Sequence, residues 1–300
     1  MTRVEKIDGA DCLPPGPCAL QQHPRYGAAV TALGGRVTQL RHEGSTALIL
    51  HRKLGPVPVC WMARGPVMQP GAPPDATIRA ILAHLPRGVR LALPGDCAHA
   101  PLYRGAGYRA IMTGAHVAEL DLRPSAATRL AVQHGKWRNR LHRAMDAPMQ
   151  ITHRPLDPAT DLPLLSLEEA QRRARRYRAL PARFTLAYAA TGADAARVFL
   201  AYHRGALAGF VLLLLHPPVA TYHLGWSGPE GRRLGAHPLL LWRASNWLAQ
   251  NGVTRLDLGS LDTDTAPGLA RFKLGMGAQP VALGPTLLRL PCLTRVRPVV

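Results

Sequence analysis

The chain has 300 residues and 47% hydrophobic residues, enough to bury the core of one large or two medium-sized domains. Its N-terminus lacks an apolar signal segment, and its longest aliphatic run, residues 210–215, is far shorter than the roughly 20 residues of a transmembrane helix, so we expect a cytoplasmic protein without a transmembrane segment. The net charge of +19 favours a polyanionic partner, namely RNA, DNA, anionic lipid or a phosphorylated cofactor. A GC-rich coding sequence would account for the excess of arginine, but not for only 18 acidic residues.

The first 123 residues have an α/β pattern. Strand-like runs at residues 35–40, 45–51, 57–62 and 89–93 alternate with turn signals, and residues 75–85 carry apolar residues at helical spacing. Residues 110–122 read as a pair of strands that closes this unit. We therefore predict a first domain over residues 1–123 and a second over residues 124–300.

Two basic helices are predicted next. In residues 124–147, Lys136, Arg138 and Arg140 surround an apolar stripe; they can contact phosphate, or they can simply be the solvated face of a helix. Residues 166–180 carry five arginines within seven residues, with Ser166 and Glu169 as a capping box. Such crowding of like charges favours an anionic partner for this helix.

The second half continues with strands at residues 183–188, 197–202, 208–215 and 221–226. The run at 210–215 is apolar on both faces, which predicts a central strand covered on both sides. A loop with three glycines at 228–235, a helix from Pro238 to the Asn251-Gly252 stop, a strand at 253–258 and a short helix follow. A helix N-terminus beside a strand end suits a phosphate or pyrophosphate.

Several motifs in this half resemble those of GNAT-fold acyltransferases of the FemA/FemB/FemX type. They are Tyr222 to Ser227, Leu239 to Ala244, Leu256 to Gly259, and the run Gly268, Leu269, Phe272, Lys273, Gly277, which is similar to the family's "GL..FK..FG" signature with Met276 in place of a second Phe. Lys136, Arg138, Arg140 and Ala144 are similar to the family's basic helix. Tyr103, Gly105, Gly107 and Tyr108 sit where the family has a "Y..aGF" turn, which implies a degenerate copy of the same fold in the first half.

The resemblance implies two tandem GNAT-like α/β domains with mixed central sheets flanked by helices. It also implies an N-acyltransferase that moves an acyl or aminoacyl group from acyl-CoA or aminoacyl-tRNA to an amine. In GNAT enzymes the loop that corresponds to residues 228–235 binds the coenzyme A pyrophosphate. In this chain Arg232, Arg233, Gly235 and Ala236 match the first part of that motif. His237 replaces a small residue of that motif, and this departure is compatible with an aminoacyl-tRNA donor.

Lys273 and Asp257 are the catalytic candidates. Lysine is scarce, with four residues in the chain, and a lysine can neutralise negative charge near a transferring ester or phosphate, the role that the resemblance implies for Lys273. Asp257 ends a strand and either faces the crevice or caps the next turn. Asp262, Asp264 and His223 are more typical of turns and of a core, whereas Tyr222, Trp226 and Phe272 are candidates for the substrate pocket.

Other chemistries find little support. The five cysteines have no zinc spacing, so we expect reduced structural thiols and no metal, and no P-loop, EF-hand or HExxH motif occurs. The alternative to an enzyme is a non-catalytic nucleic-acid-binding protein on a degenerate acyltransferase scaffold, which the charge alone motivates.

Overall fold

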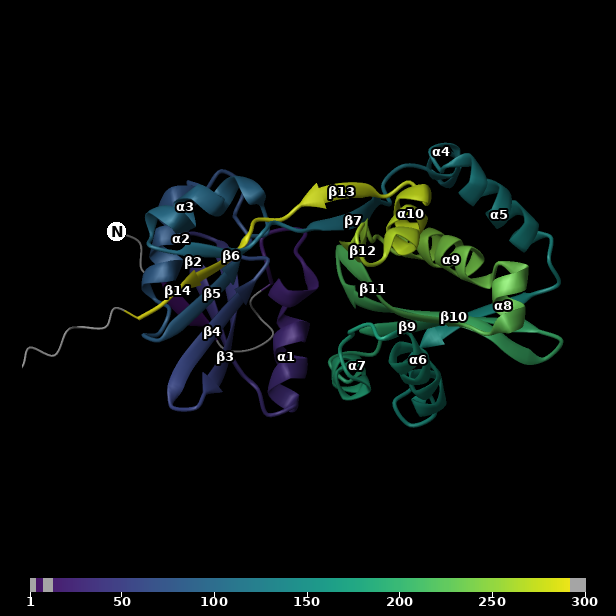
Figure 1. Ribbon diagram of the computed structural model, residues 1–300, viewed down its shortest axis with the longest axis horizontal. Helices are drawn as coiled ribbons and strands as arrows, with labels where there is room; N and C mark the ends of the chain where they lie inside the picture. Colours follow the sequence, from purple (N-terminus) through teal and green to yellow (C-terminus); the bar gives the residue numbers. More distant parts are fainter. Residues whose placement is uncertain (1–3, 8–12, 292–300) are drawn as a thin grey trace, which may run out of the picture.

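The computed structural model of the chain describes residues 4–7 and 13–291. These residues form two lobes, each built on a seven-stranded mixed sheet (Figure 1). The strand order is β1-β2-β3-β4-β5-β14-β6 in the first sheet and β13-β7-β12-β11-β10-β9-β8 in the second. The predicted class, two tandem α/β units with mixed sheets flanked by helices, is confirmed.

The first lobe holds the chain's N-terminal strands and helices. Its strands are β1 (Glu5–Ile7), β2 (Arg36–His42), β3 (Ser45–Leu54), β4 (Val57–Ala63), β5 (Val89–Leu93), β6 (Arg109–Met112) and β14 (Thr286–Arg289). Its helices are η1 (Leu20–Gln22), α1 (Pro24–Ala32), α2 (Pro74–Ala83), η2 (Cys97–His99) and α3 (Ala100–Gly105). The apolar face predicted at 75–85 is buried against the sheet, with Ile78 and Ile81 at its centre.

The second lobe carries the motifs of the family resemblance. Its strands are β7 (His116–Asp121), β8 (Gln150–Pro155), β9 (Ala196–His203), β10 (Ala206–His216), β11 (Val219–Ser227), β12 (Arg255–Leu261) and β13 (Gln279–Ala282). Its helices are α4 (Ala126–Ala131), α5 (Gly135–Met145), α6 (Leu162–Arg175), α7 (Ala182–Ala189), α8 (Pro229–Leu234), α9 (Ala236–Gln250) and α10 (Pro267–Gly275). Helices α5, α9 and α10 lie on one side of the sheet and α6 and α7 on the other (Figure 1). Strand β10 is therefore the central, doubly covered strand that its apolar run predicts.

Each sheet contains at least one strand from the other side of the predicted boundary between residues 123 and 124. Strand β7 precedes the boundary but pairs with β12 and β13 in the second sheet. Strand β14 comes from the end of the chain but pairs with β5 and β6 in the first. The expected strand pair at 110–122 is wrong for this reason, because β6 and β7 belong to different sheets.

The lobes also share a buried core. Helix α1 of the first lobe packs on α7 of the second, and the rings of Tyr26 and Phe184 are 5.2 Å apart. Arg25 extends from α1 and donates from Nη1 to the carbonyl oxygen of Leu215 at 2.7 Å, where the hydroxyl of Tyr188 also donates. Burial of these side chains holds the two lobes together.

Four local predictions need correction. Residues 183–188 are in helix α7, and residues 229–234 of the predicted loop form helix α8. The helix predicted over 124–147 is two helices, because the chain breaks between α4 and α5. Helix α6 begins at Leu162, so Ser166 lies inside it and donates to the carbonyl of Leu162 instead of capping. Among the described residues, no helix is long and apolar enough to cross a bilayer.

Candidate active site

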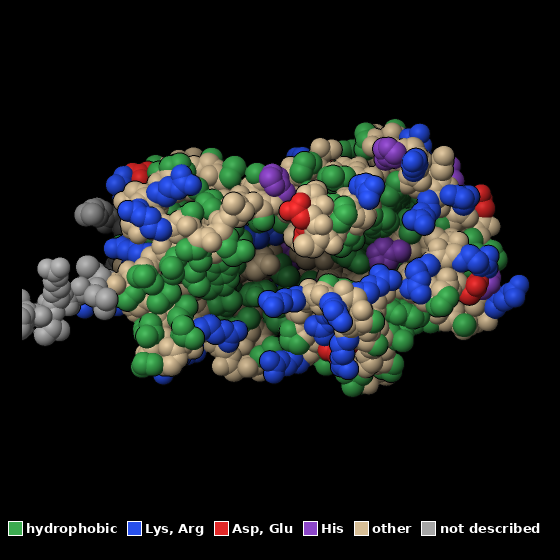
Figure 2. Space-filling view, viewed as in Figure 1, with side chains coloured by type: hydrophobic (Ala, Val, Ile, Leu, Met, Phe, Trp, Pro, Cys, Tyr) green, Lys and Arg blue, Asp and Glu red, His purple; other side chains and the backbone are tan. Residues whose placement is uncertain are grey.

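A crevice opens where β11 and β12 stop pairing. The two strands are parallel and paired only from Val219 to Thr221 on β11. Directly afterwards β11 contains a bulge: Leu213 pairs with Tyr222 and Leu212 with Leu224, so His223 is an extra residue. A bulge bends its strand and increases the local twist, which separates β11 from β12 at this end of the sheet. Figure 2 shows the resulting hollow in the second lobe, between the layer of α9 and α10 and helix α6.

Aromatic rings form one wall of the crevice. The Tyr222 hydroxyl and Nε2 of His237 share a hydrogen bond of 3.2 Å, and the His237 ring stands edge-on to Phe272 at 5.5 Å. Gly225 completes the wall, since a Cβ there would lie 2.3 Å from the Tyr222 hydroxyl. Burial lowers the pKa of His237 to about 4, so its imidazole is neutral near pH 7.

Lys273 on α10 is buried against the half of β12 that borders the crevice. It is only 6% exposed, and its Nζ donates to the carbonyl oxygen of Ser260 at 2.7 Å, on the half of β12 that β11 has left. Burial lowers the pKa of Lys273 to about 8, while the neighbouring Asp257 carboxylate acts in the opposite direction. The lysine is thus a buried cation at neutral pH that can release its proton at mildly alkaline pH.

Asp257 lies next to Lys273, but both of its carboxylate oxygens have other partners. Oδ1 accepts the N–H of Gly259 at 2.7 Å, and Oδ2 accepts Nη1 of Arg64 at 2.5 Å. The side chain is 2% exposed. The structure therefore brings the two catalytic candidates together and places Asp257 beneath the turn that precedes Ser260.

The opposite wall contains residues that the sequence analysis did not single out as catalytic. Glu168 on α6 is 2% exposed, and its Oε1 accepts the hydroxyl of Tyr177 at 2.8 Å. Gln171 donates from Nε2 to the carbonyl oxygen of Gly225 at 3.1 Å and ties α6 to the separated half of β11. Burial raises the pKa of Tyr222, and Tyr177 and Glu168 raise it further because they lie near it. The available signal was one glutamate at a position that α6 turns toward the sheet, the most deeply buried charged residue of that helix.

The predicted phosphate-binding residues lie at the junction of α8 and α9. Arg232 donates from Nη1 to the carbonyl oxygen of Ser227, and Arg233 forms an ion pair with Glu230 at 2.7 Å. Gly235 has a φ of +74° and lets the chain turn from α8 into α9, whose first residue, Ala236, is buried. The junction has a helix N-terminus, but each of its arginines already has a partner within the protein.

The predicted basic helix is α5, which packs beside α10. Lys136 and Arg140 are exposed, whereas Arg138 is half-buried and donates to the carbonyl of Ala131. Trp137 points inward and contacts Phe272, with ring centroids 5.8 Å apart. Helix α5 therefore connects an exposed basic face with the helix that carries Lys273.

The remaining candidates have ordinary structural partners. Trp226 stacks on Phe210 at 6.3 Å, outside the aromatic wall formed by Tyr222. His223 shares a hydrogen bond with Thr185 on α7 at 2.8 Å. Asp262 accepts hydrogen bonds from the backbone N–H groups of Asp264 and Thr265, as a turn residue does.

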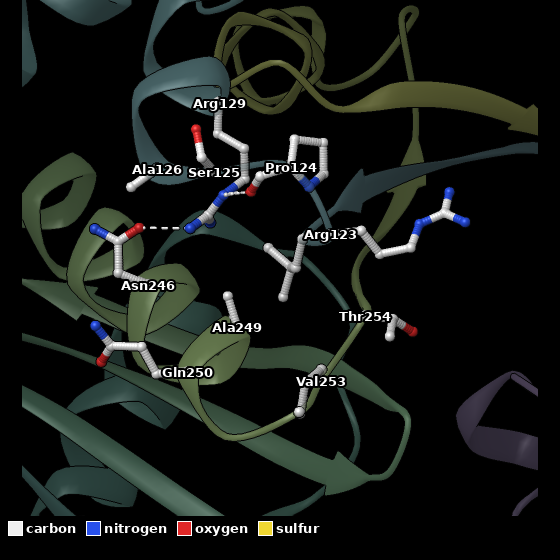
Figure 3. Close-up of a pocket in the computed structure, with 12 residues that line it drawn as sticks. Arg123, Pro124, Ser125, Ala126, Arg129, Asn246, Ala249, Gln250, Val253 and Thr254 are labelled. Atoms are coloured by element: carbon white, nitrogen blue, oxygen red, sulfur yellow. Dashed lines mark hydrogen bonds between the residues drawn. The ribbon is translucent and has the colours of Figure 1, made fainter.

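A cavity of about 450 Å³ lies elsewhere, at the end of β12 opposite the crevice (Figure 3). Arg129 lines it and is held by the carbonyl of Pro124 and the side chain of Asn246. None of the predicted site residues borders this cavity. Over the described part of the chain, no group of three or more His, Cys, Asp or Glu side chains is arranged to hold a metal ion.

Comparisons with known proteins agree with the fold described above. Residues 129–276 match the family model described as acetyltransferase (GNAT) domain. The crystal structure of FemX is similar over 95% of this chain and 97% of that chain, with a TM-score of 0.79 and 13% identity. A tandem GNAT protein from the clavulanic acid biosynthesis pathway is similar over 96% and 99%, with a TM-score of 0.53 and 15% identity.

The structure of L-PGS from Bacillus licheniformis is similar over 93% of this chain and 93% of that chain, with a TM-score of 0.55 and 14% identity. No curated protein matches the chain in sequence. The resemblance predicted from the motifs, a GNAT fold of the FemX type, is confirmed, and at these identities the structural matches speak for the fold alone.

Proposed function

We propose that this chain, a GNAT-type N-acyltransferase with the fold of FemX, transfers an aminoacyl group from aminoacyl-tRNA to an amine in the β11–β12 crevice. The observation that carries the proposal is the buried ammonium of Lys273. It extends from α10 and donates to the carbonyl oxygen of Ser260, on the half of β12 that no longer pairs with β11, beside an aromatic wall. A cation in such a water-poor site stabilises negative charge much more than one in water does.

The reaction requires attack of a neutral amine on the ester carbonyl. The new C–N bond forms and the carbonyl oxygen becomes negative. The C–O bond to the tRNA ribose then breaks as the ribose oxygen takes up the proton that the amine has lost. In our proposal Lys273 faces the negative charge that develops on these oxygens. The neighbouring Asp257 carboxylate favours the protonated form of Lys273. Tyr222 and Phe272 border the acyl group.

The amine must lose a proton during the attack, and the α6 wall offers an acceptor. Tyr177 is 39% exposed and donates to the buried carboxylate of Glu168. We propose that the proton passes from the amine to the Tyr177 oxygen while the Tyr177 proton passes to Glu168. A buried carboxylate that is connected to the surface by one phenol suits this transfer.

Charge and the α8–α9 junction support a tRNA donor. Lys and Arg side chains border the hollow of the second lobe in Figure 2. Lys136 and Arg140 on α5 and the arginines that follow Arg172 near the end of α6 are exposed. The internal partners of Arg232 and Arg233 make this junction less free to hold a pyrophosphate. Acyl-CoA is the second candidate donor, favoured by the GNAT family model. An aminoacyl-tRNA donor would place the protein in the cytoplasm.

The test measures donor binding first. We would titrate the protein with bulk aminoacylated tRNA, the same tRNA after deacylation, and acetyl-CoA, each at 50 and 200 mM salt. We expect aminoacylated tRNA to bind more tightly than deacylated tRNA, with salt weakening both because phosphate contacts release counterions. Saturable thermal stabilisation by acetyl-CoA alone would assign the thioester donor instead. Binding that ignores aminoacylation and vanishes at high salt would count against a tRNA donor.

Transfer is then measured with labelled donor and a panel of amines that includes lysine and lysyl peptides. We expect Lys273→Ala to lower the transfer rate by about 100- to 1,000-fold, as the loss of an oxyanion-stabilising group does. Arg271→Ala is the matched control, since Arg271 is an exposed cation on the same helix. Unchanged transfer by Lys273→Ala would overturn the site assignment.

A further inference from the structure

An arginine of the first lobe reaches into the second lobe directly below the crevice. Arg64 follows β4 in a left-handed conformation, with φ of +54°. Its Nη1 donates to Asp257 on β12 at 2.5 Å, and its Nη2 donates to Glu119 on β7 at 3.3 Å. The side chains of Arg64, Asp257 and Glu119 are 11%, 2% and 13% exposed. This is a buried ion-pair network between the lobes, which Arg255 extends by its contact with Glu119 at 3.2 Å.

Hydrogen bonds continue from this network to the lysine. Asp257 uses its other oxygen to hold the N–H of Gly259, a turn residue with φ of +79°. The next residue is Ser260, and its carbonyl oxygen accepts Nζ of Lys273 at 2.7 Å. A Cβ on Gly259 would lie 3.8 Å from that Nζ, so the turn and the ammonium are in close contact.

We infer that Arg64 is a positioning residue for the transfer reaction: it fixes Asp257 on the Gly259 turn, and the turn fixes the Lys273 ammonium in the crevice. The inference rests on the proposed function of Lys273. Without Arg64, Asp257 would be a buried carboxylate without its strongest partner, free to turn toward Lys273. The first lobe would thus contribute directly to the geometry of the reactive site.

The charges near Lys273 give the inference a measurable signature. Asp257 is the charge that acts directly on Lys273, and Arg64, Glu119 and Arg255 belong to the ion-pair network that holds Asp257. Other charged or titratable groups on α10 and the helices packed against it include Arg271, His134 and Lys136, which are exposed to solvent, and His237, whose ring contacts Phe272. Removal of the Arg64 cation leaves Asp257 less neutralised, which favours protonated Lys273 and moves its titration to higher pH. Removal of the Asp257 charge has the opposite effect.

The experiment compares kcat against pH for wild type, Arg64→Gln and Asp257→Asn with saturating donor. We expect the alkaline limb, where Lys273 loses its proton, to move up in Arg64→Gln and down in Asp257→Asn. We expect kcat to fall by about 10- to 100-fold in Arg64→Gln, the cost of a small displacement at the site. Arg64→Lys restores the charge without the forked geometry, so its limb should lie near that of wild type while kcat recovers only in part. Arg79→Gln is the control, because Arg79 forms an exposed ion pair with Asp75 in the same lobe.

Two outcomes separate this inference from the proposed function. If Lys273→Met transfers at the wild-type rate, the role of Lys273 fails. If Lys273→Met is inactive but Arg64→Gln keeps the wild-type rate and alkaline limb, only the inference about Arg64 is overturned. Loss of rate in parallel with melting temperature, with the limb unmoved, would likewise reduce Arg64 to a structural ion pair. If Arg64→Gln does not fold, Arg64→Lys and Asp257→Asn decide the question by the same two readouts.

Discussion

At the residue scale, the proposed site contains a lysine in a chain whose basic residues are mostly arginine. Only four of the 37 basic residues are lysines, and three of them lie outside the crevice. An arginine at position 273 would stay charged at any accessible pH and would need a wider space for its planar fork. The compact ammonium fits against the Ser260 carbonyl, and its burial brings the proton within reach of mildly alkaline pH.

Burial of Lys273 predicts a specific dependence of stability on pH. Because its pKa is about 8 in the folded chain and near 10.5 when unfolded, the unfolded chain binds more protons between these values. Wild type should therefore gain free energy of unfolding relative to Lys273→Met as pH rises from 8 to 10.5, by up to about 3 kcal/mol. Urea unfolding of both proteins at several pH values measures the difference, with Arg271→Met as the control that should show none. A constant difference across this window would contradict the buried cation.

Gly225 gives a second residue-scale prediction. A Cβ at this position would meet the Tyr222 hydroxyl at 2.3 Å and Cε1 of His237 at 2.5 Å, so Gly225→Ala must displace the aromatic wall. We expect a loss of about 1–3 kcal/mol in the free energy of unfolding and a clear loss of transfer. Gly268→Ala is the control, because nothing lies within 4 Å of the added methyl and the site is helical. Equal stability of the two variants would show that the wall can shift freely.

At the element scale, local patterns predicted β10, α2, α9 and the approximate place of Lys273, since each depends on a run of neighbouring residues. The features that local patterns did not predict depend on contacts with residues far away in the sequence. The bulge at His223 appears only when β11 is set beside β10, and residues 183–188 form a helix because they pack against α1 of the other lobe. The exchange of β7 and β14 between sheets and the contact of Arg64 with Asp257 link residues that are far apart in the sequence, 193 positions in the case of Arg64 and Asp257, and no local pattern encodes such pairings.

Packing of α5 on α10 provides a prediction at the same scale. Trp137 is 6% exposed, contacts Phe272 and lies 3.1 Å from the position that a Cβ on Gly275 would occupy. Trp137→Ala should cost about 3–5 kcal/mol of stability. It should also lower transfer, because α10 carries Lys273. Met145→Ala, at the exposed end of α5, should change stability by less than about 0.5 kcal/mol. Chemical denaturation checks the stability, and transfer well below the melting temperature checks the coupling to α10.

At the scale of the whole molecule, charge is distributed unequally between interior and surface. Many of the 18 acidic residues already pair with nearby arginines, among them Asp161 with Arg154 and Asp194 with Arg197. The arginines that remain are largely at the surface, where they suit a polyanion. The interior instead holds neutral histidines: His23 and His216, with ring centroids 5.7 Å apart, lie where the lobes meet, and His223 and His237 lie at the crevice.

These histidines predict that acid weakens the fold. Burial lowers the pKa of His23, His223 and His237 to about 4 and that of His216 well below its usual value. The unfolded chain takes up their protons near pH 6.5 while the folded chain does not, so stability is fully present above pH 6.5 and declines as pH falls toward 4. Each of the first three accounts for up to about 3 kcal/mol over that range.

Urea midpoints from pH 7.5 to 4 should fall steeply in wild type and less steeply in His223→Gln, which can keep the bond to Thr185 but cannot titrate. The exposed His84 supplies the control His84→Gln, whose slope should equal that of wild type. If His223→Gln has the wild-type slope too, His223 does not contribute to the acid sensitivity. Acid sensitivity that added salt removes would be assigned to repulsion among the surface cations instead.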